Sequence, residues 1–130
     1  DSFNYGKVSA GTASSTLTLF GETGITAIND GNVIETFYIQ GADTACPWTL
    51  VTGSPGSGQY RHEFCNMAGG CSSYPANYTA MTTNYLDSEL ATGVAKEGGT
   101  VDFQLRITVP SSTSCYDPES IDVTIVAVGP

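Results

Sequence analysis

The fold class is decided by residues 101–109, which read Val-Asp-Phe-Gln-Leu-Arg-Ile-Thr-Val. Every odd position is apolar and every even position is polar. Because side chains alternate between the two faces of a β-strand, the stretch predicts a strand with one face in the core. Residues 121–125 repeat this alternation. The Ser- and Thr-rich loop between them, with Asp117-Pro118, has turn chemistry, so the two strands are predicted to pair antiparallel.

Further short strands are predicted between turns rich in Gly and Pro, at residues 15–20, 33–40, 48–52 and 59–65. Residues 66–97 stay unassigned, because 76–86 fits either a loop or a short helical turn before an extended path resumes at 90–95. Seven or eight short strands at this spacing predict an all-β fold, a two-sheet antiparallel sandwich of the immunoglobulin-like or jelly-roll-like kind. The length fits a single domain over residues 1–130.

The composition argues against several classes of partner. Thirteen acidic residues against four basic ones give a formal net charge of −9, so the chain repels phosphate backbones and anionic lipids. No apolar stretch reaches the roughly 20 residues that cross a bilayer, so neither nucleic-acid binding nor membrane insertion of the mature chain is expected. A chain that opens at Asp1 without Met is expected of a processed, secreted protein or of a trimmed one.

Four cysteines, Cys46, Cys65, Cys71 and Cys115, form an even set without metal-like spacing, which favours disulfides and an oxidising, extracellular compartment. The alternative is buried free thiols in a cytosolic protein. If strand directions alternate along the chain, all four cysteines gather at one end of the sandwich. Among the three possible connectivities, Cys65 with Cys71 and Cys46 with Cys115 is favoured.

The single histidine, His62, shares its predicted strand face with Tyr60 and Phe64, and it is interpreted as a packed core residue rather than a general base. A serine or cysteine triad would need this histidine, and the chain has neither a Gly-x-Ser-x-Gly elbow nor a phosphate-binding glycine motif. The sequence therefore predicts no catalytic residue, no metal site and no cofactor. A small secreted enzyme is the least favoured hypothesis.

Two carboxylate pairs, Asp117 with Glu119 and Asp87 with Glu89, have the residue types for acid and base work on a glycan, but solvated loop carboxylates explain them. Exposed aromatic rings stack on sugars, and the candidates are Trp48, Tyr74, Tyr78 and Tyr85. Of these, Trp48 is interpreted as a core residue. Asn77-Tyr78-Thr79 is a glycosylation sequon, so Asn77 is a candidate glycosylation site on an exposed loop.

The order of these segments resembles the immunoglobulin-like sandwich modules of prokaryotic surface proteins. The residues that carry the resemblance are Lys7-Val-Ser-Ala-Gly-Thr, Ser15-Thr-Leu-Thr-Leu, Asn29-Asp-Gly-Asn-Val, Phe37-Tyr-Ile-Gln-Gly, Trp48-Thr-Leu, Gln59-Tyr-Arg-His-Glu-Phe and Phe103-Gln-Leu-Arg-Ile-Thr-Val-Pro. Such modules occur in fibre subunits like the TasA-like and archaeal bundling-pilin proteins. The resemblance implies that a terminal strand of one subunit completes the sheet of the next. The four cysteines are not part of the family's pattern.

The two ends of the chain give independent support for assembly. Residues 1–10 form a possible donated strand, with Phe3, Tyr5 and Val8 as its apolar side chains, and an outward-facing Val126 and Val128 near an edge invite a partner. The alternative, which the sequence supports equally, is that these strands complete the two sheets of their own monomer. The leading hypothesis is a structural subunit of an extracellular surface filament or pilus-like fibre that binds copies of itself. The alternative is a monomeric secreted adhesin that binds glycans or other surface proteins.

Overall fold

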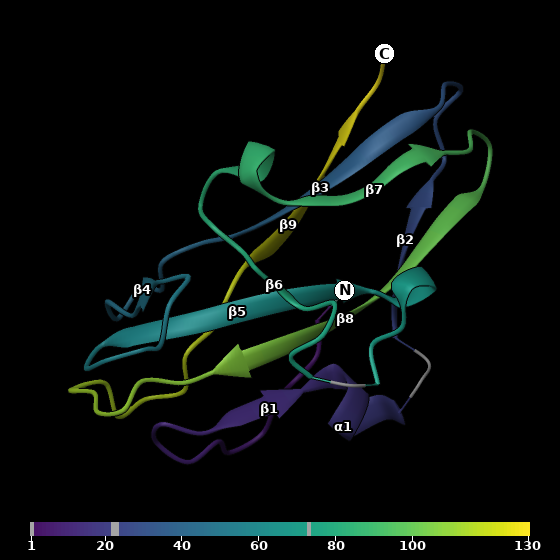
Figure 1. The fold of residues 1–130 in the computed structure, drawn as a ribbon. Helices are drawn as coiled ribbons and strands as arrows, with labels where there is room; N and C mark the ends of the chain where they lie inside the picture. The colour runs from purple at the N-terminus through teal and green to yellow at the C-terminus, as the bar shows by residue number, and fades with distance from the viewer. Residues whose placement is uncertain (1, 22–23, 73) are drawn as a thin grey trace.

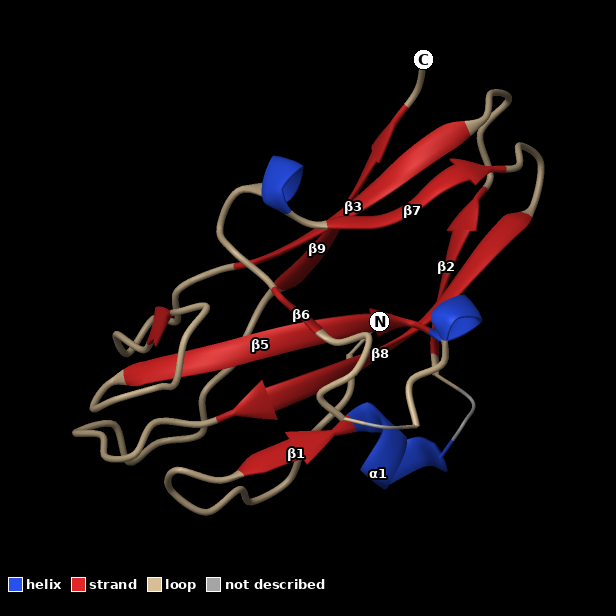
Figure 2. Ribbon diagram, in the orientation of Figure 1, coloured by secondary structure: helices blue, strands red, loops and turns tan. Residues whose placement is uncertain are grey.

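The structure, a computed structural model, describes residues 2–21, 24–72 and 74–130. Two β-sheets pack face to face, and the helical turns are short and peripheral (Figures 1 and 2). The predicted all-β, two-sheet sandwich is therefore confirmed. The described residues form nine strands, two of which span only two residues.

The larger sheet is built around two long antiparallel strands, β5 (Gln59–Asn66) and β8 (Gly99–Thr108). Four shorter strands pair with their outer edges, namely β1 (Ala13–Ser15) and β2 (Ile25–Asn29) on β8, and β4 (Thr49–Leu50) and β6 (Thr79–Ala80) on β5. A 3-10 turn, η2 (Met67–Gly69), directly follows β5. Only the short β4 lies parallel to its neighbour.

The smaller sheet has three antiparallel strands in the order β7 (Glu89–Val94), β3 (Glu35–Gly41) and β9 (Val123–Val128). A second 3-10 turn, η3 (Tyr85–Asp87), precedes β7. β7 and β9 are therefore edge strands, each with one side not paired to a strand of its own sheet.

The core lies between the sheets, and the odd-numbered face of β8 contributes to it as its alternation predicts. The buried apolar residues of the main cluster are Phe37, Ile39, Phe64, Met81, Leu90, Val94, Val101, Phe103 and Leu105. A second cluster, which we call the terminal cluster, consists of Tyr60, Ile107 and Val109. The even face of β8 is not simply solvated, because Gln104 is buried and its amide donates to the carbonyl of Gly21.

The predicted pairing of residues 101–109 with 121–125 is wrong. β8 and β9 belong to different sheets, and β9 pairs with β3, with Ile39 opposite Ile125. The loop between β8 and β9 is long enough to cross from one sheet to the other, so nearness in sequence did not fix the partner. The predicted strands at 33–40 and 59–65 correspond to β3 and β5, and the extended path at 90–95, within the unassigned interval, corresponds to β7.

The predicted strand at residues 15–20 is also wrong. Ser15 ends β1, and Thr16–Phe20 form the short helix α1. The Ser15 hydroxyl accepts a hydrogen bond from the Thr18 backbone N–H at 3.1 Å, which satisfies a free donor of the helix start. The buried Thr16 hydroxyl accepts one from the Leu105 backbone N–H, which fixes the helix against β8. These side-chain hydrogen bonds stabilise a helical turn, although the β-branched Thr16 and Thr18 favour a strand.

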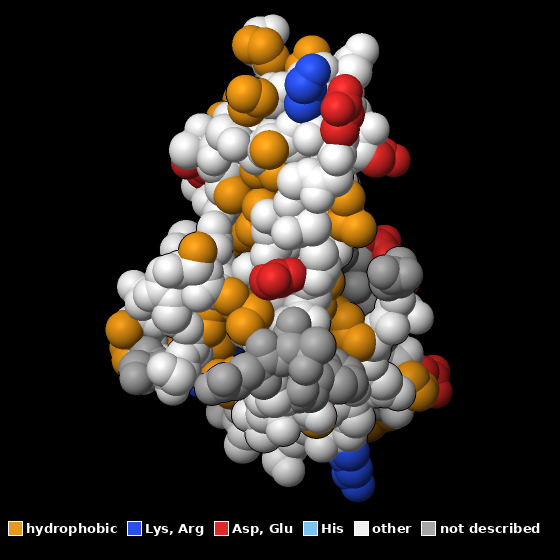
Figure 3. Space-filling view, turned by 90° about the vertical axis from the view of Figure 1, so that its right-hand side faces the viewer, with side chains coloured by type: hydrophobic (Ala, Val, Ile, Leu, Met, Phe, Trp, Pro, Cys, Tyr) orange, Lys and Arg blue, Asp and Glu red, His pale blue; other side chains and the backbone are white. Residues whose placement is uncertain are grey.

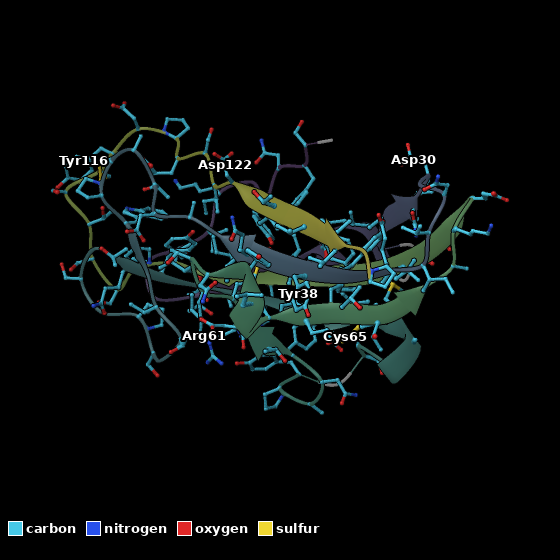
Figure 4. The ribbon with its side chains drawn as sticks, turned by 90° about the horizontal axis from the view of Figure 1, so that it is seen from above. Asp30, Tyr38, Arg61, Cys65, Tyr116 and Asp122 are labelled. Carbon is cyan, nitrogen blue, oxygen red and sulfur yellow. A yellow bond between two sulfur atoms is a disulfide. The ribbon has the colours of Figure 1, made fainter. Side chains whose placement is uncertain are left out.

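Both predicted disulfides, Cys46–Cys115 and Cys65–Cys71, are present, with Cα–Cα distances of 6.1 and 5.8 Å. Their predicted gathering at one end is wrong. Cys46 lies close to β4, which pairs with the start of β5, whereas Cys65 lies near the end of β5 and so about 20 Å further along the strand. Figure 4 shows Tyr116, next to Cys115, far from Cys65. The prediction counted residues 48–52 as a full, direction-reversing strand, but β4 has only two residues.

Candidate assembly site

The N-terminal segment, residues 2–8, belongs to no strand of either sheet in the described part of the chain. It bends at Gly6, whose φ of 70° lies in the left-handed region and whose N–H donates to the Asn4 side chain at 2.7 Å. The segment is nevertheless attached to the domain through its side chains. Donation of residues 1–10 as a strand stays a prediction, and within the single chain the segment folds against its own sandwich.

Tyr5 is the main attachment point of the N-terminal segment. Its ring packs against both core clusters, and its hydroxyl forms a 2.8 Å hydrogen bond with Nε2 of His62. The Phe3 ring meets the Tyr5 ring edge-on, with centroids 4.9 Å apart, while Phe3 itself is 37% exposed. Burial raises the pKa of the Tyr5 hydroxyl, so it is a neutral phenol at all ordinary pH values.

His62 extends from the core face of β5, between Tyr60 and Phe64, and is 1% exposed. Nδ1 of its ring is buried and has no hydrogen-bond partner among the described residues. Burial lowers the pKa of His62 from 6.5 to about 3, so the imidazole is neutral at ordinary pH. The interpretation of His62 as a packed core residue agrees with this geometry. We call His62 and the terminal cluster around it the His62 niche.

Val8 completes the attachment, because it packs on the terminal cluster beside Trp48, Leu50 and Ile121. Val126 and Val128 lie in the edge strand β9 of the smaller sheet, and Val128 is 40% exposed. The structure thus brings Tyr5 and Val8 onto one site in the larger sheet and leaves the two valines of β9 on the other sheet. A role for all of these residues in assembly stays a prediction.

The opposite face of β5 carries an ion-pair network that sequence reasoning missed. Glu63 is 1% exposed and contacts Arg61 at 2.9 Å and Arg106 at 2.8 Å. Arg106 lies directly across from Glu63 in the β5–β8 ladder, and its guanidinium stacks on the Tyr74 ring, 3.5 Å from the centroid. The alternating charges of Arg61, Glu63 and Arg106 on two predicted strands were the available signal.

The loop over this network, of which residues 71–72 and 74–78 are described, is held by the Cys65–Cys71 disulfide and by Asn77. Asn77 has a φ of 65°, and its amide nitrogen donates to the carbonyls of Gly69 and Gly70 at 2.8 and 2.9 Å. A glycan on this nitrogen would replace one of the two hydrogens, so it would break one of the two bonds. Asn77 thus fastens the loop, and its glycosylation stays a prediction.

The aromatic residues considered for sugar stacking do not form one platform. The indole N–H of Trp48 donates to the Thr113 hydroxyl at 2.9 Å, and the ring packs near Tyr60. Tyr74 and Tyr78 meet edge-on over the larger sheet, whereas Tyr85 packs on Tyr38 of the smaller sheet. Their rings are therefore occupied by contacts within the chain.

An open groove of about 630 Å³ lies between β7 and the first half of β8, with η2 beside it. Its walls are mostly small or aliphatic residues, namely Met67, Ala91, Gly93, Val94, Ala95, Gly99 and Val101, with Asn66, Thr92, Thr100 and Asp102 as polar members. Figure 3 shows apolar side chains between the upper and lower layers at this end of the molecule. The groove lacks an aromatic wall, so it suits an extended peptide better than a sugar ring.

Comparison with protein-family models, curated proteins and solved structures gives no match. The resemblance to prokaryotic fibre subunits therefore stays a prediction that rests on the residues quoted for it. In the described part of the chain, no helix has the length and apolarity to cross a membrane. Cys46, Cys115 and Glu119 lie close enough together to suggest a metal site, but both sulfur atoms are already joined in a disulfide.

Proposed function

We propose that the protein is a structural subunit of an extracellular filament, in which residues 2–8 of one subunit occupy the His62 niche of the next. The observation that carries this proposal is the mode of attachment of the N-terminal segment. Tyr5 is partly buried and packs on both core clusters, yet in the described part of the chain the segment belongs to no strand and no disulfide fastens it. A segment that is attached through side-chain contacts, as at Tyr5 and Val8, is exchangeable between copies.

The exchange costs little free energy, because the segment makes the same contacts in a neighbouring subunit as in its own. Burial of Tyr5 and Val8 contributes roughly 1.5 to 3 kcal/mol for each large side chain, before the entropy of association is subtracted. The segment is joined to β1 by residues 9–12, which are coiled by the bond from Thr12 N–H to the Ser9 carbonyl. Extended, these four residues span about 14 Å. Head-to-tail exchange that does not close into a ring builds a filament, whereas reciprocal exchange between two subunits would stop at a dimer.

Two further features support an extracellular structural role. Both disulfides are formed in the structure, which suits an oxidising compartment. The net charge of −9 opposes association of like subunits, so filament growth is expected to be faster at high ionic strength, where this repulsion is screened.

The test compares the full chain with a chain that begins at Gly11, using light scattering for size and circular dichroism for fold. The full chain is expected to form filaments at high concentration, and the shortened chain is not. Because the deletion exposes the His62 niche, a second arm adds a synthetic peptide of residues 1–10 to the full chain. The peptide is expected to cap growth, while a peptide with Tyr5→Ser is not. A full chain that stays monomeric at all concentrations and salt levels would overturn the filament proposal.

The alternative function, a monomeric adhesin, is favoured by the groove between β7 and β8. Its lining of small residues beside the free edge of β7 suits an extended peptide of another surface protein. A chain that stays monomeric and binds such peptides, with binding lost on Gly93→Val, would establish this alternative.

A further inference from the structure

We infer that the His62 niche accepts the tyrosine-bearing segment only while the imidazole is neutral, so that proton uptake by His62 releases the segment. The same contact holds the segment within one chain and, by the function proposed above, between two copies. The inference therefore rests on that function for its role in assembly, but its chemistry is testable in a single chain.

The geometry of the His62 niche disfavours a charged imidazole. Among the described residues, the ring of His62 forms one hydrogen bond, between Nε2 and the Tyr5 hydroxyl, and its Nδ1 is buried without a partner. A protonated imidazole has two N–H donors. The Tyr5 oxygen accepts one of them, and the other N–H remains unsatisfied in a buried site, which costs the desolvation of a charged donor.

The groups that face the ring offer no compensating charge. Tyr5 from the N-terminal segment and Tyr60 from β5 are its titratable neighbours, with ring centroids at 5.9 and 6.3 Å. Across the ladder, β8 places the apolar Ile107 opposite His62, and the chain before β7 contributes a backbone bond from Met81 N–H to the His62 carbonyl. Because these contacts bring no charge to the ring, desolvation is the dominant effect on the pKa of His62.

The nearest acids and bases act on other groups. Arg61 and Glu63 flank His62 in sequence but lie on the opposite face of β5, where Glu63 pairs with both Arg61 and Arg106. Asp43 and Asp122 act on the Tyr60 hydroxyl rather than on the imidazole.

The sign of the pH effect follows from the proton count. With the segment in place, the pKa of His62 is lowered to about 3 by burial. When Tyr5 leaves, water reaches the ring, and the pKa returns toward the ordinary value of about 6.5. The released state therefore binds more protons between these two values, and the attachment is strongest above pH 6.5 and weakens as the pH falls toward 3. From pH 7 to pH 5, the equilibrium constant for release is expected to rise about 25-fold.

The chain supplies two unique reporters for the test, since it contains one histidine and one tryptophan. An acceptor dye on the N-terminal amine reports release by energy transfer from Trp48, because Trp48 and Tyr5 pack against the same terminal cluster. The measurement is made on dilute, monomeric full-length chain between pH 4 and pH 8. The imidazole resonances of His62 are followed by NMR over the same range.

The expected result is a release constant that rises about 25-fold from pH 7 to pH 5 in the natural chain and stays flat in His62→Gln, whose amide can still bond to Tyr5. Equal pH dependence in both chains would overturn the inference. If His62→Gln does not fold, Tyr5→Ala replaces it. The NMR pKa of His62 is then expected to move from its lowered value toward 6.5, and an unmoved pKa would likewise overturn the inference.

Filament formation is measured separately, by light scattering at pH 5 and pH 7. Filaments at either pH support the proposed function, and because the contact is the same within and between chains, the single-chain measurement alone decides the inference. Proton-linked release in a chain that never forms filaments would support the inference and overturn the proposed function.

Discussion

His62 and Glu63 are neighbours in β5, both are 1% exposed, and each is covered by a segment outside the regular strands, but the two coverings are built differently. On the core face, the N-terminal segment covers His62 through one hydrogen bond and apolar packing. On the opposite face, the loop of residues 71–78 covers Glu63 with a disulfide at its base and a tyrosine stacked on Arg106. One covering is held by side-chain contacts, and the other is covalently anchored.

The charge of the residue under each covering matches the way in which that covering is attached. Glu63 is charged and is neutralised by two arginines, so it is stable only while its partners stay in place. A disulfide keeps the chain from leaving this face. His62 is neutral and carries no counter-charge, so its covering can leave and return, with a proton as the only exchanged charge. By the function proposed above, the exchangeable N-terminal segment and the permanently attached loop thus lie on opposite faces of β5.

The largest effect is expected from Glu63→Gln. This change leaves Arg61 and Arg106 largely buried without their carboxylate, and breaking a buried ion pair by removal of one partner costs about 3 kcal/mol. Denaturant unfolding monitored by Trp48 fluorescence measures the loss. Glu97→Gln, at an exposed carboxylate near Lys96, is the matched control and should leave the unfolding midpoint unchanged. Equal midpoints for the two variants would show that the network does not hold the outer face.

A smaller loss is expected from the double change Cys65→Ser with Cys71→Ser. The disulfide closes a loop with a sequence separation of 6, and loss of so short a loop costs about 2 kcal/mol in the chain-entropy description. Hydrogen exchange at residues 71–78 should increase, while release of the N-terminal segment should not change. If the double variant loosened both coverings equally, the two faces would be one cooperative unit and the contrast between them would fail.

The smallest effect is expected from Tyr5→Phe, which keeps the ring but removes the bond to His62. Leaving Nε2 without a partner costs about 1 kcal/mol. Energy transfer from Trp48 to the labelled N-terminus should show more released segment at pH 7, with unfolding of the domain nearly unaffected. Tyr116→Phe, at a residue that is 91% exposed, is the control. An unchanged released fraction in Tyr5→Phe would mean that packing alone holds the segment.

The sequence predicts this fold where side-chain burial alone determines the structure. The alternation in residues 101–109 predicts a strand with an apolar odd face, because β8 buries that face against the other sheet. It fails where a long loop allows either sheet as partner, as with residues 121–125, and where a few side-chain bonds decide, as at Ser15 and Thr16 of α1. Local periodicity indicates neither which strand a segment pairs with nor which side-chain hydrogen bonds it forms.

The candidate site follows the same division. The apolar side chains of Tyr5 and Val8 and the packed state of His62 are predictable from their patterns. The bond between Tyr5 and His62 is not, because 57 residues separate them and nothing in either local pattern selects the other. The same limit applies to the disulfides. Their pairing is predictable, but their positions depend on the direction of β5, which the short, parallel β4 decides.

The order of the strands has a consequence for synthesis and folding. The first strand pairs with β8, and β3, near the start of the chain, pairs with β9 at its end, so neither sheet is complete until nearly the whole chain is present. Contacts between such distant segments make folding slow, since a large loop must close before each pair forms. A growing chain therefore carries Phe37 and Ile39 of β3 without a strand partner until β7 has been made, and the smaller sheet stays incomplete until β9 follows.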